Sequence, residues 1–263
     1  MADYETIELE IDDRGVAHLV MNRPDKRNAL SAQLIADLSA AAHALSTNDR
    51  VRVVILSGAG DYFCAGGDLA WMRQQIDADR EQRIAEARKL AMMLSALNEL
   101  PKPLIGQVHG GAFGGGLGMI SVCDTVIAAE TSKFGFTEAR LGLIPATISP
   151  YVLARMGETN ARQVFMSARM FDAREASRLA LVSSVVSETE IESAVETEIK
   201  PYLSAAPKAV AASKALTRLM GLQINEAIVE ETIKRLADTW EDEEAKIGID
   251  AFFAKSPPPW AAS

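Results

Sequence analysis

Hydrophobic and polar positions along the first fifty residues predict a β-hairpin followed by an amphipathic helix. Apolar and polar residues alternate over residues 6–11, a polar turn of residues 12–15 follows, and residues 16–22 form a second, mainly apolar run. Two such runs joined by a short turn that ends in glycine are typical of a hairpin. Ser31 then precedes a stripe at helical spacing, which favours a capped helix with one buried face. Its apolar positions are Leu34, Ile35, Leu38, Ala41, Ala42 and Leu45.

Three further apolar segments predict buried strands. Residues 51–56 and 103–108 are apolar runs, and residues 125–129 form a third. Continuous runs of this kind are typical of strands that are covered on both faces. Residues 69–98, between the first two runs, have a mostly helical pattern. The order strand, helix, strand, helix, strand predicts an α/β core with right-handed crossovers.

The last part of the chain is predicted to be mainly helical. Beyond about residue 145, segments rich in Ala, Leu, Arg and Glu have helical periodicity, and only residues 184–186 indicate a short strand. No repeat of fixed period interrupts this pattern. The sequence therefore predicts an α/β core followed by a helical carboxyl-terminal region.

Composition and charge narrow the classes of function. The chain has 263 residues, 48% of them hydrophobic, which suits one globular core with a terminal extension. A formal net charge of −9 argues against non-specific binding to nucleic acid. No apolar run approaches the roughly 20 residues that span a bilayer, and the amino-terminal residues lack the basic start and apolar core of a signal peptide. We therefore expect no membrane association. The chain has only two cysteines, Cys64 and Cys123, for which we expect buried thiols, and this low number favours a reducing compartment and hence a cytoplasmic location.

Each of the first two buried strands is followed by a glycine-rich loop, at residues 57–67 and 110–118. Ligands of open α/β sheets bind at the carboxyl ends of strands, and glycine lets backbone N–H groups approach them. The second loop also opens a helix, whose first amides lack intrahelical partners and favour negative charge. Neither loop has the spacing of a dinucleotide or P-loop motif, and the three histidines have no metal-ligand spacing. We therefore expect a ligand site built from main-chain N–H groups at these two loops.

Several segments, in the same order along almost the whole chain, resemble the enoyl-CoA hydratase/isomerase (crotonase) family. They include FCAGGDL at residues 63–69 and FGFTEARLGLIP at residues 134–145, together with residues 22–30, 109–124 and 252–255. The resemblance implies a crotonase-like α/β stack of ββα units in residues 1–195. It also implies a helical region in residues 196–263 that assembles a homotrimer or a dimer of trimers. The implied substrate is an acyl-CoA, whose coenzyme A is part of the substrate, with no metal and no other cofactor.

By the same resemblance, the thioester oxygen of the substrate lies between the backbone amides of Gly67 and Gly115, which form an oxyanion hole. Glu138 matches one of two glutamates that hydratases of the family commonly use, and Gly118 stands at the position of the other. Two interpretations follow for a single proton-carrying residue. Either Glu138 alone serves an enoyl-CoA hydratase, or it moves a proton between the α- and γ-carbons, as in a Δ3-Δ2 enoyl-CoA isomerase.

The departure at Gly118 favours hydration of a branched or dicarboxylic acyl group. A glycine in place of glutamate is expected to open volume beside the reacting carbons and to remove a charge that repels a second carboxylate. Residues 137–151 also resemble bacterial hydratases that act on methylglutaconyl-CoA and isohexenylglutaconyl-CoA, which makes 3-methylglutaconyl-CoA a candidate substrate. For Arg140 we expect a structural ion pair in preference to a contact with the substrate carboxylate.

Residues around the two loops are also candidates for substrate binding. The basic ones are expected to contact the nucleotide and pantetheine of coenzyme A, and Lys255 to reach it across a subunit boundary. The predicted substrate-binding residues are Arg23, Lys26, Arg27, Ala65, Asp68, Leu69, Gly114, Gly118 and Lys255.

Functions of a different class stay open at this stage. Relatives in the family include RNA-binding hydratases, but residues 77–89 mix charges of both signs instead of forming a lysine-rich face. A catalytically idle acyl-CoA-binding protein is compatible with the loss of one glutamate. Proteases of the related fold need a nucleophilic serine at the helix start, where this chain has Gly116 and Leu117.

Overall fold

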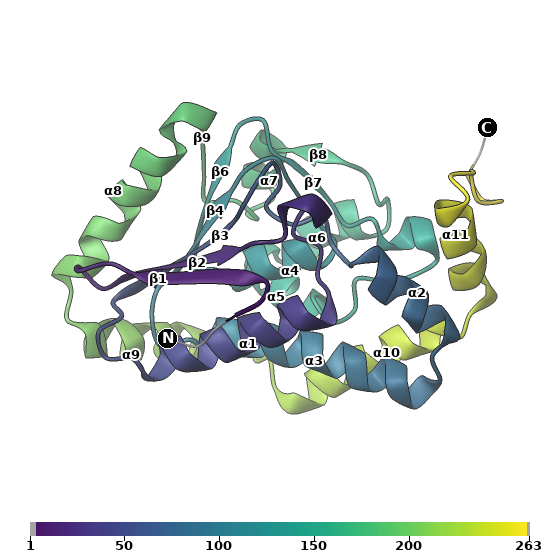
Figure 1. The fold of residues 1–263 in the computed structure, drawn as a ribbon, viewed down its shortest axis with the longest axis horizontal. Coiled ribbons are helices and arrows are strands. Elements are labelled where there is room, and N and C mark those ends of the chain that lie inside the picture. Colours follow the sequence, from purple (N-terminus) through teal and green to yellow (C-terminus); the bar gives the residue numbers. More distant parts are fainter. Residues whose placement is uncertain (1–3, 262–263) are drawn as a thin grey trace.

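The computed structural model describes residues 4–261, and a six-stranded sheet forms its centre (Figure 1). Its strand order is β1-β2-β3-β4-β6-β9, with β1 antiparallel to β2 and every other pair of neighbours parallel. The strands are β1 (Ile7–Ile11), β2 (Val16–Met21), β3 (Val53–Gly58), β4 (Leu104–Val108), β6 (Thr125–Ala129) and β9 (Ser184–Val186). The predicted hairpin, the three buried strands and the short late strand are thus confirmed.

A second, three-stranded sheet was not predicted. It consists of β5 (Gly111–Phe113), β7 (Lys133–Gly135) and β8 (Phe171–Asp172), with β7 in the middle. Strands of two or three residues are too short to have a recognisable period, so pairing with distant segments decides their structure. Aromatic side chains pack beside this sheet: the rings of Phe134 and Phe171 stack with centroids 5.8 Å apart.

The helices of the first half are α1 (Ala32–Thr47), α2 (Leu69–Asp77), α3 (Arg80–Glu99) and α4 (Gly115–Val122). Three of them, α1, α3 and α4, pack against one face of the central sheet, whereas α2 lies at one end of the molecule. Ser31 caps α1 as predicted, because its hydroxyl accepts a hydrogen bond from the amide of Leu34 at 3.2 Å, and all six predicted apolar positions of α1 are buried. The helical pattern over residues 69–98 divides into α2 and α3, because Asp79 forms a capping box with Gln82.

The second half is mainly helical, as predicted. Its helices are α5 (Ser149–Met156), α6 (Glu158–Phe165), α7 (Ala173–Arg178), α8 (Ile191–Ser204), α9 (Pro207–Met220), α10 (Glu226–Trp240) and α11 (Glu243–Phe253). It also contains the 3-10 turns η2 (Glu138–Leu141) and η3 (Glu188–Glu190), while a third such turn, η1 (Pro24–Lys26), lies in the first half between β2 and α1. The predicted division between residues 195 and 196 lies inside α8, and its outer ends, residues 1–3 and 262–263, lie outside the described residues. Within residues 4–261, none of the helices combines the length and the apolar character needed to cross a bilayer.

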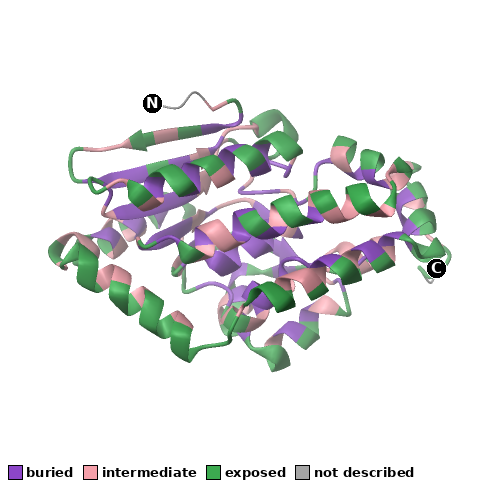
Figure 2. Ribbon diagram, turned by 90° about the horizontal axis from the view of Figure 1, so that it is seen from below, coloured by how far each residue is buried: buried purple, intermediate pink, exposed green. Residues whose placement is uncertain are grey.

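Two apolar layers hold the sheet between helices. The larger core fills the space between the sheet and α1, α3, α4 and α5, while Ile191, Val195 and Ile199 of α8 cover the opposite face. Figure 2 shows the buried residues gathered in the middle of the molecule and the outer faces of the helices exposed. By contrast, α9 contributes no buried residue. α2, α10 and α11 lie together at one end, to the right in Figure 1.

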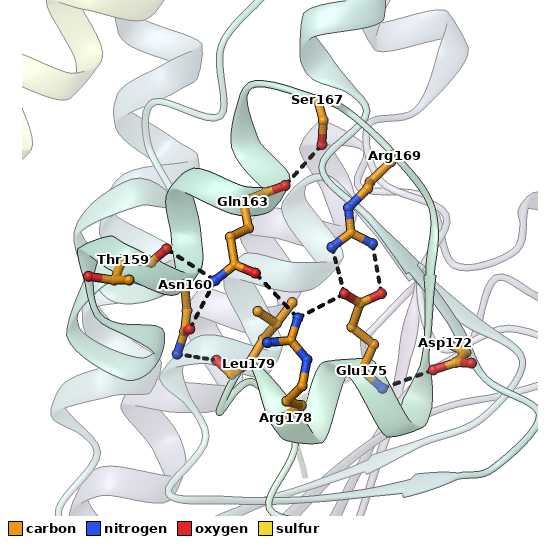
Figure 3. A network of polar contacts seen from close by, with 9 residues as sticks. All are labelled: Thr159, Asn160, Gln163, Ser167, Arg169, Asp172, Glu175, Arg178 and Leu179. Atoms are coloured by element: carbon orange, nitrogen blue, oxygen red, sulfur yellow. Dashed lines mark hydrogen bonds and ion pairs between the residues drawn. The ribbon is translucent and has the colours of Figure 1, made fainter.

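A polar network fixes α7 against the edge of the second sheet (Figure 3). The carboxylate of Asp172 caps α7 by accepting a hydrogen bond from the amide of Glu175 at 2.9 Å. The carboxylate of Glu175 accepts two bonds from the guanidinium of Arg169, at 2.6 and 2.7 Å, and one from Arg178 at 3.0 Å. These bonds lower the pKa of Glu175 to about 2, the Arg169 bond contributing most, so the network stays charged.

Candidate active site

The two glycine-rich loops meet at the carboxyl end of the central sheet. The amide of Cys64 donates to the carbonyl of Gly111 at 3.1 Å, and the amide of Phe113 donates back to Cys64 at 3.0 Å. On the other side of the first loop, the amide of Leu30 donates to Gly66 at 2.7 Å. The first loop therefore runs as an extended segment between β5 and Leu30, which places it directly beside the start of α4.

Glycine is required at two points of this contact. Gly66 has φ +94°, and a Cβ atom there would lie 3.1 Å from the carbonyl oxygen of Phe113. Gly114 has φ +50° and ψ −117°, and its Cβ position lies 3.1 Å from Oε1 of Glu138. Side chains of other residues rarely adopt these backbone angles. The loops therefore approach each other, and the Glu138 carboxyl, as closely as backbone permits.

Two backbone amides at this junction remain without a protein partner. Leu30 bonds to the carbonyl of Gly66 and to the amide of Asp68, so the amide of Gly67 between them is not used. Gly115 is the first residue of α4, where an amide has no intrahelical acceptor. Within residues 4–261, neither amide donates to another group of the protein. Both glycines line one cavity of about 390 Å³, and the α4 dipole favours negative charge beside Gly115.

The cavity wall is largely apolar and comes from many parts of the chain. Its apolar side chains include Leu30, Met72, Leu90, Leu143, Ile148 and Trp240, and its polar ones Thr137, Glu138, Arg140 and Thr147. Among the lining residues that the structure describes, Glu138 is the single carboxylic acid. An apolar pocket with a few convergent polar groups is typical of a small-molecule site.

Glu138 begins η2 and directs its carboxyl to the junction of the loops. Its Oε2 atom is buried and has no hydrogen-bond partner in the described part of the chain, although the residue as a whole is partly exposed. Burial raises the pKa of Glu138 from 4.5 to about 7, and a hydrogen bond from its own backbone amide offsets part of the effect. Near neutral pH the carboxyl therefore exists in both protonation states, which suits a group that both takes and returns a proton.

The structure brings half of the predicted site residues together at one cavity. Gly67, Gly115 and Glu138 line the same cavity, and so do Ala65, Leu69 and Gly114. These residues lie together around one cavity, while their roles toward a substrate stay predictions.

Arg23 and Asp68 are used by the fold itself. Their side chains form an ion pair at 2.9 Å, and Arg23 also donates to the carbonyl of Ala29. Asp68 caps α2 by accepting bonds from the amides of Ala70 and Trp71. Burial alone raises the pKa of Asp68, but these hydrogen bonds outweigh it and lower the pKa. Neither residue lines the cavity, so their side chains hold the loop and α2 in place.

The other basic candidates lie outside the cavity wall. Lys26 and Arg27 are exposed at η1, where the Arg27 guanidinium lies 4.9 Å from the ring centroid of Tyr62. Lys255 is exposed just after α11, with φ +52°. Their contact with coenzyme A stays a prediction.

The expectation that Gly118 opens volume beside the reacting atoms is wrong. Gly118 is buried in α4 and does not line the cavity. A Cβ atom at this position would lie 2.9 Å from Cβ of Ile148, and closer still to its Cγ2. Since Ile148 lines the cavity, its side chain fills the space that a larger residue at position 118 would need.

The expected structural ion pair of Arg140 is not found either. Arg140 is exposed, lines the cavity and forms no ion pair with any residue in the described range. Glu138 lies in the same turn, η2, but burial rather than a nearby charge accounts for the raised pKa of that carboxyl. The guanidinium is thus available to an anionic group in the cavity.

Several cavity residues were not predicted. Leu30 is one, since its Cδ1 atom lies 2.5 Å from the Cβ position of Gly115, and Met72 is another, with its Cγ 3.6 Å from the Cβ position of Gly67. Thr147 and Trp240 also face the cavity. In the sequence, Leu30, Met72 and Trp240 have only the pattern of core residues, so no signal marks them as parts of a site.

Both cysteines are buried as predicted, and burial raises the pKa of each thiol to about 12. In the described range, no three His, Cys, Asp or Glu side chains gather in a way that would hold a metal ion.

The chain is similar to several known proteins over most of its length. A family model described as "Enoyl-CoA hydratase/isomerase" matches residues 12–263. The chain is 34% identical to a probable enoyl-CoA hydratase of Rhizobium meliloti, over 96% of both chains. It is 30% identical to enoyl-CoA delta isomerase 2 of Rattus norvegicus, over 95% of this chain and 64% of that one. A crystal structure of a putative enoyl-CoA hydratase from Mycobacterium avium paratuberculosis superposes with a TM-score of 0.88 at 31% identity, over 97% of this chain and 99% of that chain.

Proposed function

Because this chain belongs to the enoyl-CoA hydratase/isomerase family, we propose that it adds water to the double bond of a 2-enoyl-CoA with Glu138 as its proton carrier. One observation carries the proposal: a buried carboxyl with a pKa of about 7 shares a cavity with the backbone amides of Gly67 and Gly115, which have no hydrogen-bond acceptor among residues 4–261. Coenzyme A enters as part of the substrate, and the proposed reaction uses no other cofactor.

In the proposed reaction, the Glu138 carboxylate takes a proton from water while the water oxygen bonds to the β-carbon. The electron pair of the double bond moves toward the thioester, whose oxygen becomes negative. The amides of Gly67 and Gly115 donate hydrogen bonds to that oxygen, and one such donor is typically worth about 3 kcal/mol. Protonated Glu138 then returns its proton to the α-carbon, so that one molecule of water is added in total.

Double-bond migration is the second candidate function. No other carboxylic acid lines the cavity in the described range, and a single group is sufficient to remove an α-proton and deliver one to the γ-carbon. One relative is named an enoyl-CoA delta isomerase. Hydration remains the first proposal because the hydroxyl-bearing Thr137 and Thr147 also line the cavity, and a hydroxyl group can hold a water molecule by a hydrogen bond.

We further propose a branched or dicarboxylic acyl group, such as that of 3-methylglutaconyl-CoA. Arg140 supports this choice because it lines the cavity without an ion-pair partner among the described residues. A guanidinium forms strong, charge-assisted hydrogen bonds with a carboxylate. The glycine at position 118 adds no negative charge that would oppose such a group.

A homotrimer or a dimer of trimers is also part of the proposal. Lys214 ties the polar side of α9 to Asp124, with Nζ 2.7 Å from the carboxylate. The other side of α9 leaves large apolar residues exposed, namely Leu216, Leu219 and Met220, and Leu222 is exposed just after the helix. An exposed apolar patch of this kind typically marks an interface. Light scattering of the wild type and of Leu219→Asp tests it, and a monomeric wild type contradicts it.

A panel of CoA thioesters tests the reaction. Crotonyl-CoA, 3-methylcrotonyl-CoA, 3-methylglutaconyl-CoA and a 3-enoyl-CoA are incubated with the wild type and with Glu138→Gln. Loss of the conjugated enoyl absorbance reports hydration, and its appearance from the 3-enoyl substrate reports isomerisation. We expect hydration to be the faster reaction and Glu138→Gln to lower it by about 10²- to 10⁴-fold. Turnover that does not depend on Glu138 contradicts its role as the proton carrier. No turnover of any thioester contradicts the proposed reaction, and an idle or RNA-binding protein then becomes the better account.

A further inference from the structure

α11 and η2 approach each other more closely than side chains would allow. A Cβ atom on Gly248, inside α11, would lie 2.6 Å from the carbonyl carbon and 2.7 Å from the carbonyl oxygen of Leu141 in η2. From the other side, a Cβ atom on Gly142 would lie 2.6 Å from the amide nitrogen of Ala245. The two backbones therefore rest directly on each other at a pair of glycines.

The two glycines have different reasons to be present. Gly142 has φ +70° and ends η2 in the left-handed region, which by itself favours glycine. Gly248 lies within the regular α11 helix and has no positive φ, so its backbone angles would accept alanine, which is the better helix former. Close approach to Leu141 is thus the physical reason for glycine at position 248.

The element that Gly248 contacts carries the proposed proton carrier. η2 contains Glu138, and the amide of Leu143 just after it donates to the Glu138 carbonyl at 3.1 Å. Glu138 in turn has its Oε1 atom 3.1 Å from the Cβ position of Gly114, beside the amide of Gly115. Because the carboxyl occupies the space that a Cβ atom at Gly114 would need, a displacement of η2 changes the position and the burial of the carboxyl.

α11 also contacts the side of the cavity that carries Gly67. A small buried apolar cluster joins Ala245 and Ile249 of α11 to Met72 of α2, with Leu143 and Trp240. Met72 is the residue that packs against Gly67, at 3.6 Å from its Cβ position. At the outer end, the guanidinium of Arg73 lies 4.3 Å from the ring centroid of Phe253, and α2 and α11 lie close together in Figure 1.

We propose that Gly248 is a positioning residue, which lets the backbone of α11 seat η2 so that Glu138 faces the amides of Gly67 and Gly115. This inference rests on the proposed function. α11 then positions Glu138 through its contact with η2, and it positions the first glycine loop through its contact with Met72 of α2. The residue itself does not line the cavity, so its effect on the reaction passes through η2.

The test is Gly248→Ala, with Ile247→Ala as the matched control on the exposed side of the same helix. The added methyl group forces η2 and α11 apart and exposes the Glu138 carboxyl to water. We expect kcat for hydration to fall at least tenfold while KM changes less than threefold. Because burial is what raises the pKa of Glu138, carbon-13 NMR titration of its labelled carboxyl should show that pKa falling from about 7 toward 4.5. Ile247→Ala should keep both values.

The NMR titration makes the inference independent of the activity. If the wild type hydrates no thioester, the proposed function fails, and the titration alone still decides whether Gly248 positions the carboxyl. If Gly248→Ala does not fold, Ile249→Ala loosens the same packing without adding bulk and should lower the pKa in the same direction. The inference is overturned if Gly248→Ala folds and keeps the wild-type kcat and the wild-type pKa of Glu138. If Gly248→Ala does not fold, the inference is overturned when Ile249→Ala keeps the wild-type pKa of Glu138.

Discussion

Replacement of Glu138 by glutamine should stabilise the protein at alkaline pH while it removes the proposed proton carrier. The wild-type carboxyl is held where its charged form is poorly solvated, with Oε2 buried and unpartnered among the described residues. Glutamine has nearly the same shape and stays neutral at every pH. The comparison therefore isolates the cost of keeping a charge at this place in the cavity.

The magnitude follows from the pKa. Its value rises from 4.5 to about 7, and this difference corresponds to about 3 kcal/mol at 1.36 kcal/mol for each pH unit. Since the folded state has the higher pKa, the carboxyl favours folding fully only below pH 4.5, and this contribution is lost as the pH rises through 7. We expect the stability of Glu138→Gln relative to the wild type to increase by about 2 to 3 kcal/mol between pH 5 and pH 8.

Urea unfolding of both proteins at pH 5 and pH 8 measures this difference. A constant offset from burying the amide cancels in the comparison between the two pH values. Glu10→Gln, on the exposed edge strand β1, is the control and should give the same difference at both. If the stability difference between Glu138→Gln and the wild type is equal at pH 5 and pH 8, the carboxyl is solvated and the reasoning about its burial is wrong.

Three further predictions concern the activity. The value of kcat/KM for hydration should fall about tenfold for each pH unit below about 7, because protonated Glu138 cannot accept a proton from water; a profile that is flat from pH 5 to 8 contradicts this. Gly114→Ala should lower kcat by about 10²-fold or more, since it combines backbone strain at φ +50° with a new Cβ atom 3.1 Å from Oε1 of Glu138. Wild-type kinetics of the folded variant would show that the carboxyl does not depend on the space beside Gly114. Arg140→Gln should raise KM about 10- to 100-fold for 3-methylglutaconyl-CoA and leave crotonyl-CoA unchanged; equal effects on both thioesters exclude the carboxylate contact.

The sequence predicted the parts of the fold whose residues are periodic. The six apolar positions of α1 and the bounds of β6 and β9 agree with the structure, because burial on one face, or on both, determines those residues directly. β3 begins two residues later than the apolar run, at Val53, where pairing with Val16 starts. The residue at which a strand begins depends on its pairing with the partner strand, and the sequence of the strand alone does not show it.

The missed elements depend on distant segments. β5, β7 and β8 have two or three residues each, and they exist because the second glycine loop, Lys133 and Phe171 meet in space. α5 follows the loop at residues 142–148, which contains Pro145, and has no long apolar stripe of its own. Neither type of element has the length that a periodic pattern requires.

At the site, the backbone was easier to predict than the side chains around it. Glycines that follow two neighbouring strands had to meet at one edge of the sheet, and Gly67 and Gly115 do line one cavity. The space beside Gly118 could not be foreseen, because Ile148, thirty residues later, fills it. The free guanidinium of Arg140 could not be foreseen either, since a lone arginine in a sequence does not reveal whether an acid lies nearby.

A crystal structure with acetoacetyl-CoA, whose enolate imitates the charged intermediate, tests the central claim most directly. The account predicts that the thioester oxygen lies about 2.7–3.1 Å from the amide nitrogens of both Gly67 and Gly115, with the Glu138 carboxyl beside the acyl carbons. A thioester oxygen that contacts only one of these amides, or neither, contradicts the account.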